Sequence, residues 1–224
     1  SVTGVQTCAL PILYESKLIY NSPTFGDEVR TFCMNPNGEV VQENYNGIAT
    51  VNGHSYAEKT TNNTNFALLV SEKFTEPFKE PIQYGQHIAS LANMLGGGIL
   101  VQRFGDLLDG RRSTPERIKS SVLTPTLTCA TPGDLSLVIP YRQMTSIIEM
   151  LYALDKVCPG TASRYTLLYG IEVKFYSARV KLTNELETEG VKNLFTIGDG
   201  AGVTRGLIQA SASGVHVARV ICGR

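Results

Sequence analysis

The chain has 224 residues, in which 20 lysines and arginines balance 20 aspartates and glutamates, and 42% of the residues are hydrophobic. This composition excludes an intrinsically disordered chain, and the length suffices for one large domain or two smaller ones. The zero formal net charge gives no reason to expect a nucleic acid or an anionic membrane surface as a partner. Since no apolar run approaches the roughly 20 residues that a membrane-spanning helix needs, we expect a soluble protein.

The cysteines and histidines give no sign of a metal site. Five cysteines are scattered along the chain without a Cys-x-x-Cys pair, and His54, His87 and His216 are far apart. Zinc sites and dense disulfide frameworks need closer spacing, so we predict no metal and a reducing, cytoplasmic location. We expect the three histidines to lie at the surface or to be partly packed, without a catalytic role.

Residues 2–12, with the sequence VTGVQTCALPI, need separate treatment. They resemble the conceptual translation of a sequencing-library adapter. They also lack the basic region and the cleavage site of a secretory signal. We therefore interpret residues 1–12 as a non-native segment, expect it to be disordered or adventitiously packed, and treat the chain as a fragment of a longer protein.

The first half of the remaining chain predicts β-structure. Short apolar stretches alternate with turn residues over residues 13–51, which is typical of strands joined by hairpins. Residues 29–34 and 39–41 flank a short turn and predict one such hairpin. Residues 66–70, Phe-Ala-Leu-Leu-Val, are too apolar for an exposed strand and predict a buried one.

Helical spacing begins after the first 80 residues. An apolar stripe predicts a helix over residues 81–95, and three glycines close it. Residues 113–116, Ser-Thr-Pro-Glu, carry a capping signal for a helix through about residue 121. A second stripe predicts a long helix over residues 144–154, and the apolar run 135–139 predicts a strand. Alternation of apolar and polar residues predicts a half-buried strand over residues 171–175.

Three arginines around the start of the shorter predicted helix form a basic patch: Arg111, Arg112 and Arg117. Such a patch is usually solvated or salt-bridged. Binding of an acidic substrate group is the alternative, because a guanidinium can pair with a carboxylate through two hydrogen bonds.

A glycine-rich turn near the C-terminus carries most of the functional information. Residues 193–202 read NLFTIGDGAG, which predicts a buried strand over residues 194–197, a tight turn, and a helix of small residues over 203–221. Glycines let the backbone approach a ligand closely, and the unpaired amides at a helix start favour negative charge. The turn is not a Gly-x-Gly-x-x-Gly dinucleotide motif. From the turn alone, ligand binding and simple capping of the helix by Asp199 both stay open.

Residues 169–218 resemble the C-terminal part of bacterial FAD-dependent dehydrogenases of uncharacterised substrate, in the glutathione-reductase-type flavoprotein superfamily. The resemblance extends upstream through FALLVS, FTEPFKEPIQYG, GDLLDGRRSTPERI and ATPGDLSLVIPYR. It implies a mixed α/β fold, the C-terminal part of a Rossmann-like FAD-binding domain with an inserted α+β substrate domain. Residues 13–46 and 165–224 would belong to the FAD-binding domain, and residues 47–164 to the substrate side.

The resemblance also implies the cofactor and its contacts. In that family the aspartate of the Gly-Asp turn accepts a hydrogen bond from the ribityl chain, a role that would fall to Asp199. The other flavin contacts that it implies are Gly198, Gly200, Ala201, Gly202 and Val203, with Thr204, Arg205 and Gly206 near the pyrimidine edge. The implied activity is an FAD-dependent oxidoreductase that acts on an unknown small molecule, with NAD(P)H as a candidate electron donor and no assigned catalytic residue.

Two departures from that family bear on function. Where the family has Cys-Met-Cys-Pro-Gly-Gly, this chain has residues 33–38 as Cys-Met-Asn-Pro-Asn-Gly, which argues against a dithiol role and predicts that Cys33 is a buried strand residue. The Gly-x-Gly-x-x-Gly unit for the ADP part of FAD is missing. We therefore expect the N-terminal half of the same protein as a partner, and weak or no FAD binding and no activity for the fragment alone. The alternative is a non-catalytic truncated chain or an interaction module without a cofactor.

Overall fold

A computed structural model describes residues 2–7, 17–58, 60–72, 74–78, 80–173, 179–204 and 206–223. The chain divides into two compact units, Ser1–Lys174 and Phe175–Arg224. The first unit contains β1 (Val2–Thr7), β2 (Ile19–Asn21), β3 (Glu28–Asn35), β4 (Glu39–Tyr45), β5 (Ile48–His54), β6 (Thr64–Val70), α1 (Pro81–Gly96), β7 (Leu100–Arg103), α2 (Phe104–Leu108), α3 (Pro115–Lys119), β8 (Thr131–Pro132), η2 (Leu135–Leu137), α4 (Tyr141–Val157) and β9 (Leu167–Glu172). The second contains η3 (Asp199–Ala201) and α5 (Leu207–Ile221).

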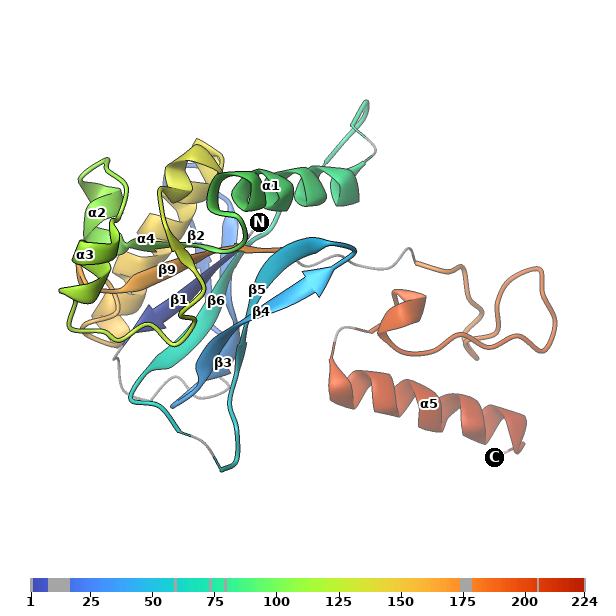
Figure 1. The fold of residues 1–224 in the computed structure, drawn as a ribbon. Coiled ribbons are helices and arrows are strands. Elements are labelled where there is room, and N and C mark those ends of the chain that lie inside the picture. The colour runs from blue at the N-terminus through green and yellow to red at the C-terminus, as the bar shows by residue number, and fades with distance from the viewer. Residues whose placement is uncertain are drawn as a thin grey trace. The chain divides into compact units, whose positions relative to one another are not determined.

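A mixed sheet forms the centre of the first unit. In the described residues its strand order is β2-β3-β6-β1-β9-β7-β8, and β4 pairs with β5 in a separate ribbon (Figure 1). The pairs are antiparallel except β7 with β8. Every residue of β6 and β9 is buried, because both faces of the sheet are covered. The predicted buried strand at residues 66–70 is confirmed.

Helix α4 covers one face of this sheet. Its residues Ile147, Leu151 and Leu154 belong to the same buried cluster as Phe66 of β6 and Leu168 of β9. The predicted apolar stripe is therefore confirmed as the core-facing side of this helix. The prediction for α1 is also confirmed, since the helix ends at Gly96 and the next glycine takes the left-handed conformation that closes a helix.

The β4–β5 ribbon covers the opposite face. Val40 and Val51 from the ribbon share a buried cluster with Tyr169 of β9. Asn93 of α1 holds the ribbon in place, because its side chain accepts a hydrogen bond from Ala49 N at 2.7 Å and donates one to Ala49 O at 2.9 Å.

The predicted hairpin between residues 29–34 and 39–41 is wrong. Strand β3 pairs with β2 and β6, whereas β4 pairs with β5. Asn46 and Gly47, at the turn between β4 and β5, both have positive φ angles, 51° and 85°. Two-residue hairpin turns have this backbone conformation, so the Asn-Gly turn determines that β4 pairs with β5.

Three further predictions differ from the structure. The apolar run 135–139 is not a strand but begins as the 3-10 turn η2, because Asp134 Oδ1 accepts a hydrogen bond from Ser136 N at 2.9 Å. Helix α3 starts after Thr114, whose side chain caps it, and ends at Lys119, before the predicted end. The strand predicted over residues 171–175 lies earlier, as β9, and residues 174–175 are outside the described part.

Residues 2–7 form a strand. We expected residues 1–12 to be disordered or adventitiously packed, but β1 lies between β6 and β9 and pairs antiparallel with both. Of the two expected alternatives, the structure therefore shows packing and not disorder for residues 2–7. Strands β6 and β9 both offer backbone N–H and C=O groups, which an extended segment of almost any sequence can satisfy. The non-native origin of residues 1–12 and the division at residues 46 and 164 stay predictions.

An ion pair joins the start of α4 to the turn before β3. Arg142 donates from Nε to Asp27 Oδ2 at 2.8 Å and from Nη2 to Oδ1 at 2.5 Å, and Ser146 Oγ adds a bond at 3.3 Å. The hydrogen bonds from the Arg142 guanidinium, and to a smaller extent the one from Ser146, hold the pKa of Asp27 below its usual range. Its carboxylate therefore stabilises the fold fully above the unfolded pKa of about 3.9, and this contribution is lost as the pH falls through the lower folded pKa.

We expect Asp27→Asn to lower the free energy of unfolding by about 1–2 kcal/mol at pH 7, a value discounted for the half-exposed guanidinium. The difference from the parent chain should close as the pH drops below about 4. Urea unfolding of both chains between pH 7 and pH 3 measures this. A difference that persists unchanged at pH 3 would contradict an electrostatic role for Asp27.

Candidate functional site

The run before the glycine-rich turn is not the buried strand that we predicted. Leu194 and Ile197 are 46% and 44% exposed. In the described part of the second unit, this run pairs only through an isolated bridge between Phe195 and Glu187 and through turn hydrogen bonds. A buried parallel strand needs neighbours on both sides. Without such neighbours, residues 182–196 fold back on themselves.

The turn itself depends on its glycines. Gly198 has φ 71° and ψ −164°, and Gly202 has φ 68°, a region that favours glycine because it has no Cβ. Residues Asp199–Ala201 between them form η3. Gly198 N donates to Ser213 Oγ of α5 at 3.0 Å, so the helix fixes the start of the turn.

Asp199 is exposed at this turn. Its Oδ1 accepts a hydrogen bond from Thr204 Oγ1 at 2.5 Å, which orients the carboxylate and leaves Oδ2 without a partner in the described residues. Helix α5 begins at Leu207, after Gly206, and no side chain caps it. The predicted helix start at residue 203 and the alternative that Asp199 caps this helix are therefore both wrong.

Most of the predicted flavin contacts lie in one turn, in which Asp199 and Gly200 are exposed and Ala201 is buried. Gly198 to Gly202 build it, Val203 and Thr204 follow, and Gly206 lies at the start of α5. Arg205 lies outside the described residues. A Cβ built on Gly200 would meet nothing within 4 Å, so the backbone of this residue is open to a ligand.

A hollow of about 500 Å³ lies beside the turn. Its lining includes Val203 of the turn, with Arg179, Lys181, Leu186 and Glu189 from the preceding meander. Val180 N donates to Ala201 O at 3.2 Å, which ties the meander to the turn. Our prediction from the sequence missed Arg179 and Lys181. The one sequence feature that marks them is the alternation of cationic and apolar residues over 179–182.

Comparison with known proteins bears on the first unit. Residues 13–175 match the family described as FAD-dependent protein, C-terminal domain-like. The chain belongs to this family. An uncharacterized protein from Clostridium beijerinckii is 33% identical to it over 217 residues, which cover 92% of this chain and 40% of the relative. The chain thus spans about two fifths of that relative.

The match supports an FAD-associated protein of mixed α/β fold. The matched range ends at residue 175, and the first unit ends at Lys174. The glycine-rich turn lies beyond the matched range. The flavin contacts there rest on the resemblance of residues 169–218 and on the geometry of the turn.

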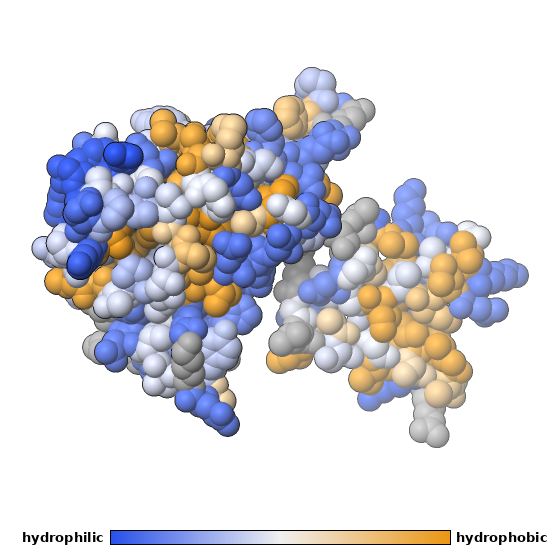
Figure 2. Space-filling view, viewed as in Figure 1, coloured by the Kyte–Doolittle hydropathy of each residue, from blue (hydrophilic) through white to orange (hydrophobic). Residues whose placement is uncertain are grey.

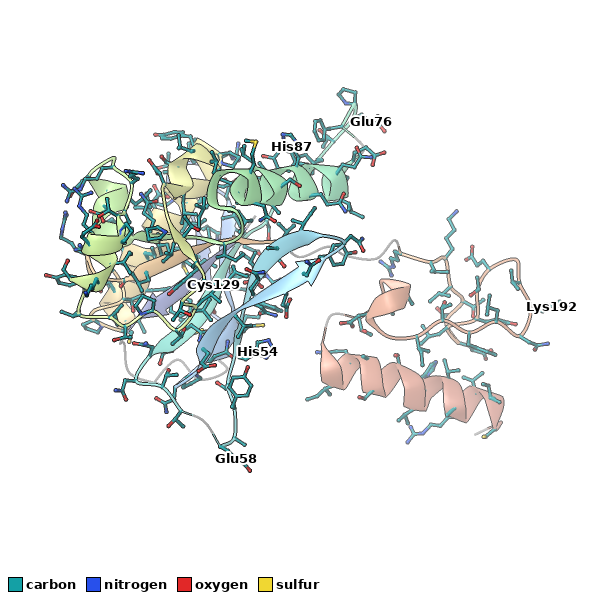
Figure 3. The ribbon with its side chains drawn as sticks, in the orientation of Figure 1. His54, Glu58, Glu76, His87, Cys129 and Lys192 are labelled. Carbon is teal, nitrogen blue, oxygen red and sulfur yellow. The ribbon has the colours of Figure 1, made fainter. Side chains whose placement is uncertain are left out.

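The three histidines of this FAD-dependent family member have different neighbours. His54 Nε2 is 3.7 Å from Glu43 Oε1, His216 Nε2 is 3.3 Å from the carbonyl oxygen of Asn184, and His87 is an exposed residue of α1 (Figure 3). Within the described ranges, no group of three or more metal-binding side chains is arranged to hold an ion. None of the helices described there is long and apolar enough to cross a bilayer.

The arginine patch has a structural function. Asp106 of α2, whose side chain is 1% exposed, receives a hydrogen bond from Arg111 Nε at 3.0 Å and lies 3.9 Å from Arg117 Nη1. Ser113 Oγ donates to the same carboxylate at 2.8 Å and accepts from Arg103 N at 2.8 Å. These bonds engage Arg111 and Arg117 with the protein's own carboxylate, as predicted for a salt-bridged face.

Cys33 lies in β3 but is half-buried rather than buried. Its φ of 46° and the register shift between Phe32 and Asn35 place it in a bulge of the strand. The prediction of a strand residue is confirmed, whereas full burial is wrong, because the bulge turns this part of β3 out of regular pairing.

Proposed function

We propose that this chain is part of an FAD-dependent oxidoreductase in which residues 198–206 contact the flavin. The observation that carries the proposal is the exposed carboxylate of Asp199 on an open glycine turn, in a chain of an FAD-dependent family. FAD, when bound, supplies the capacity to accept and pass on a hydride. The substrate is an unknown small molecule, and NAD(P)H is the proposed electron donor.

The residues of the turn suit a flavin chemically. Asp199 Oδ2 has acceptor capacity for a ribityl hydroxyl, because Thr204 engages only the other oxygen. The first amides of α5 have no side-chain cap, so this helix start carries partial positive charge. Such a charge stabilises a nearby anion by about 0.3–2 kcal/mol, which favours a reduced flavin with its negative pyrimidine edge there.

The surface of the second unit supports the proposed partner, the rest of the same protein. Ile208, Val215 and Ile221 of α5 are 82%, 52% and 66% exposed, and Figure 2 shows apolar residues gathered on the visible face of this unit. Exposed apolar side chains in such number indicate a surface that a further layer covers. The relative extends well beyond the matched portion, and we propose that the corresponding N-terminal half supplies this layer.

FAD titration tests the proposal. We expect the chain alone to bind FAD with a Kd on the order of 0.1 mM or weaker, because the turn touches only the flavin end of the cofactor. A chimera that joins this chain to the part of the Clostridium beijerinckii relative outside the match should retain FAD on purification. In the chimera, Asp199→Ala should lower flavin occupancy at least about tenfold, since a charge-assisted hydrogen bond is lost.

Glu185→Ala is the matched control, because Glu185 is an exposed carboxylate of the same unit outside the turn. Its flavin content should equal that of the parent chimera. Equal occupancy in the Asp199 and Glu185 variants would count against the assignment. A chimera that folds without flavin would favour the non-catalytic alternative. Bleaching of the bound flavin by NADH or NADPH tests the electron donor.

A further inference from the structure

The hollow beside the glycine-rich turn is lined by both cationic and apolar side chains. Arg179 and Lys181 line it, against the single carboxylate of Glu189. In the described part of the chain, neither cation has an ion-pair partner. Exposed lysines and arginines without a carboxylate neighbour can pair with an incoming anion at no cost of breaking an existing pair.

The apolar lining residues come from the same short meander and from the turn. Val180, Leu182 and Leu186 line the hollow together with Val203, and all four are half-buried. The meander is held in shape by Glu189 N, which donates to Lys181 O at 3.0 Å, and by the bridge between Leu182 and Thr188. The hollow, of about 500 Å³, is open to solvent rather than enclosed.

We propose that this hollow binds a small organic anion, an apolar body that ends in a carboxylate, as the substrate-side ligand of the enzyme. The cations would hold the carboxylate and the apolar walls would hold the body. This inference rests on the proposed function, because Val203 belongs both to the hollow and to the predicted flavin contacts. Arg179 and Lys181 are not among the predicted flavin contacts, and the proposal assigns them a ligand of this class.

Titration of the chain with benzoate, followed by backbone amide NMR, tests the proposal without flavin. Benzoate should shift amides of residues 180–186 and Val203 saturably, with a Kd on the order of 1 mM. Benzyl alcohol, which has the same ring and no charge, should bind at least about fivefold more weakly, because it cannot pair with either cation. Phenyl phosphate tests whether the site instead prefers a phosphate; tighter binding of phenyl phosphate than of benzoate would overturn the assignment to a carboxylate.

Arg179→Gln and Lys181→Gln should each weaken benzoate binding about fivefold. Lys192→Gln is the matched control, because Lys192 is exposed on an outer loop of the same unit and does not line the hollow (Figure 3). Both cationic side chains are exposed, so the variants should fold, and their amide spectra check this. Equal weakening in the Lys192 variant, or equal binding of benzyl alcohol, would overturn the proposal.

The Asp199→Ala variant separates this inference from the flavin assignment. Its benzoate affinity should stay within about twofold of the parent chain, since Asp199 does not line the hollow. Loss of flavin from the chimera with intact benzoate binding supports both proposals. Intact flavin binding without any benzoate binding would overturn the ligand site alone.

Discussion

Replacement of Asp106 by alanine is expected to lower the free energy of unfolding by about 2–3 kcal/mol, because it removes a buried carboxylate that accepts hydrogen bonds from partly exposed Arg111 and from Ser113. The carboxylate is 1% exposed and accepts hydrogen bonds from Arg111 Nε and Ser113 Oγ. Ser113 Oγ in turn accepts from Arg103 N. Asp106→Ala would therefore leave the Ser113 hydroxyl without its acceptor, and Arg111 would keep only its ion pair with Asp109 at 3.0 Å. Urea unfolding followed by circular dichroism measures the loss.

Ser113→Ala is the graded control for Asp106. It removes one hydroxyl from the same cluster and leaves the charges in place, so it should cost about 1–2 kcal/mol. If Asp106→Ala cost no more than Ser113→Ala, the charged cluster would contribute little. The arginine patch would then be available for an acidic ligand after all.

The elements that the sequence predicts well are those whose apolar residues have one clear spacing. Helices α1 and α4 follow stripes that end at glycines or before a proline, and β6 is an uninterrupted apolar run that is buried throughout. In each case the segment's own residues determine both its conformation and its buried side.

The predictions that failed depend on partners elsewhere in the chain. Residues 194–197 have the composition of a buried strand, yet Leu194 and Ile197 are exposed because no parallel strand flanks them in the described residues. Strand β3 pairs with β6, about 35 residues downstream, rather than with β4, the next strand along the chain. Local spacing does not specify long-range pairing, and the resulting error is one of topology.

The candidate site shows the same limit. Asp199 and its glycines could be predicted because the turn is continuous in sequence and resembles a known flavin motif. Arg179 and Lys181 were missed, because their alternation with apolar residues does not reveal that the meander joins Val180 to Ala201. The predicted helix start at residue 203 was wrong because Gly202 ends η3 in the left-handed conformation and α5 begins only at Leu207.

Gln6→Pro is expected to lower the free energy of unfolding by about 3 kcal/mol or more. Gln6 lies in β1, opposite Asn65 of β6 and Leu167 of β9. A proline within a strand that is paired on both sides removes a ladder hydrogen bond and adds a steric clash. Amide hydrogen exchange should rise along β6 and β9 together, because both strands lose part of a shared neighbour.

Glu58→Pro is the matched control, since Glu58 lies on an exposed loop between β5 and β6 (Figure 3). This substitution should leave both unfolding and exchange nearly unchanged. Equal effects of the two prolines would mean that residues 2–7 pair too weakly to stabilise the sheet. The disorder that the adapter-like sequence predicts would then describe them in solution. A large effect of Gln6→Pro alone would mean that the sheet needs a strand between β6 and β9. It would also mean that the backbone hydrogen bonds of this strand, more than its side chains, stabilise the sheet.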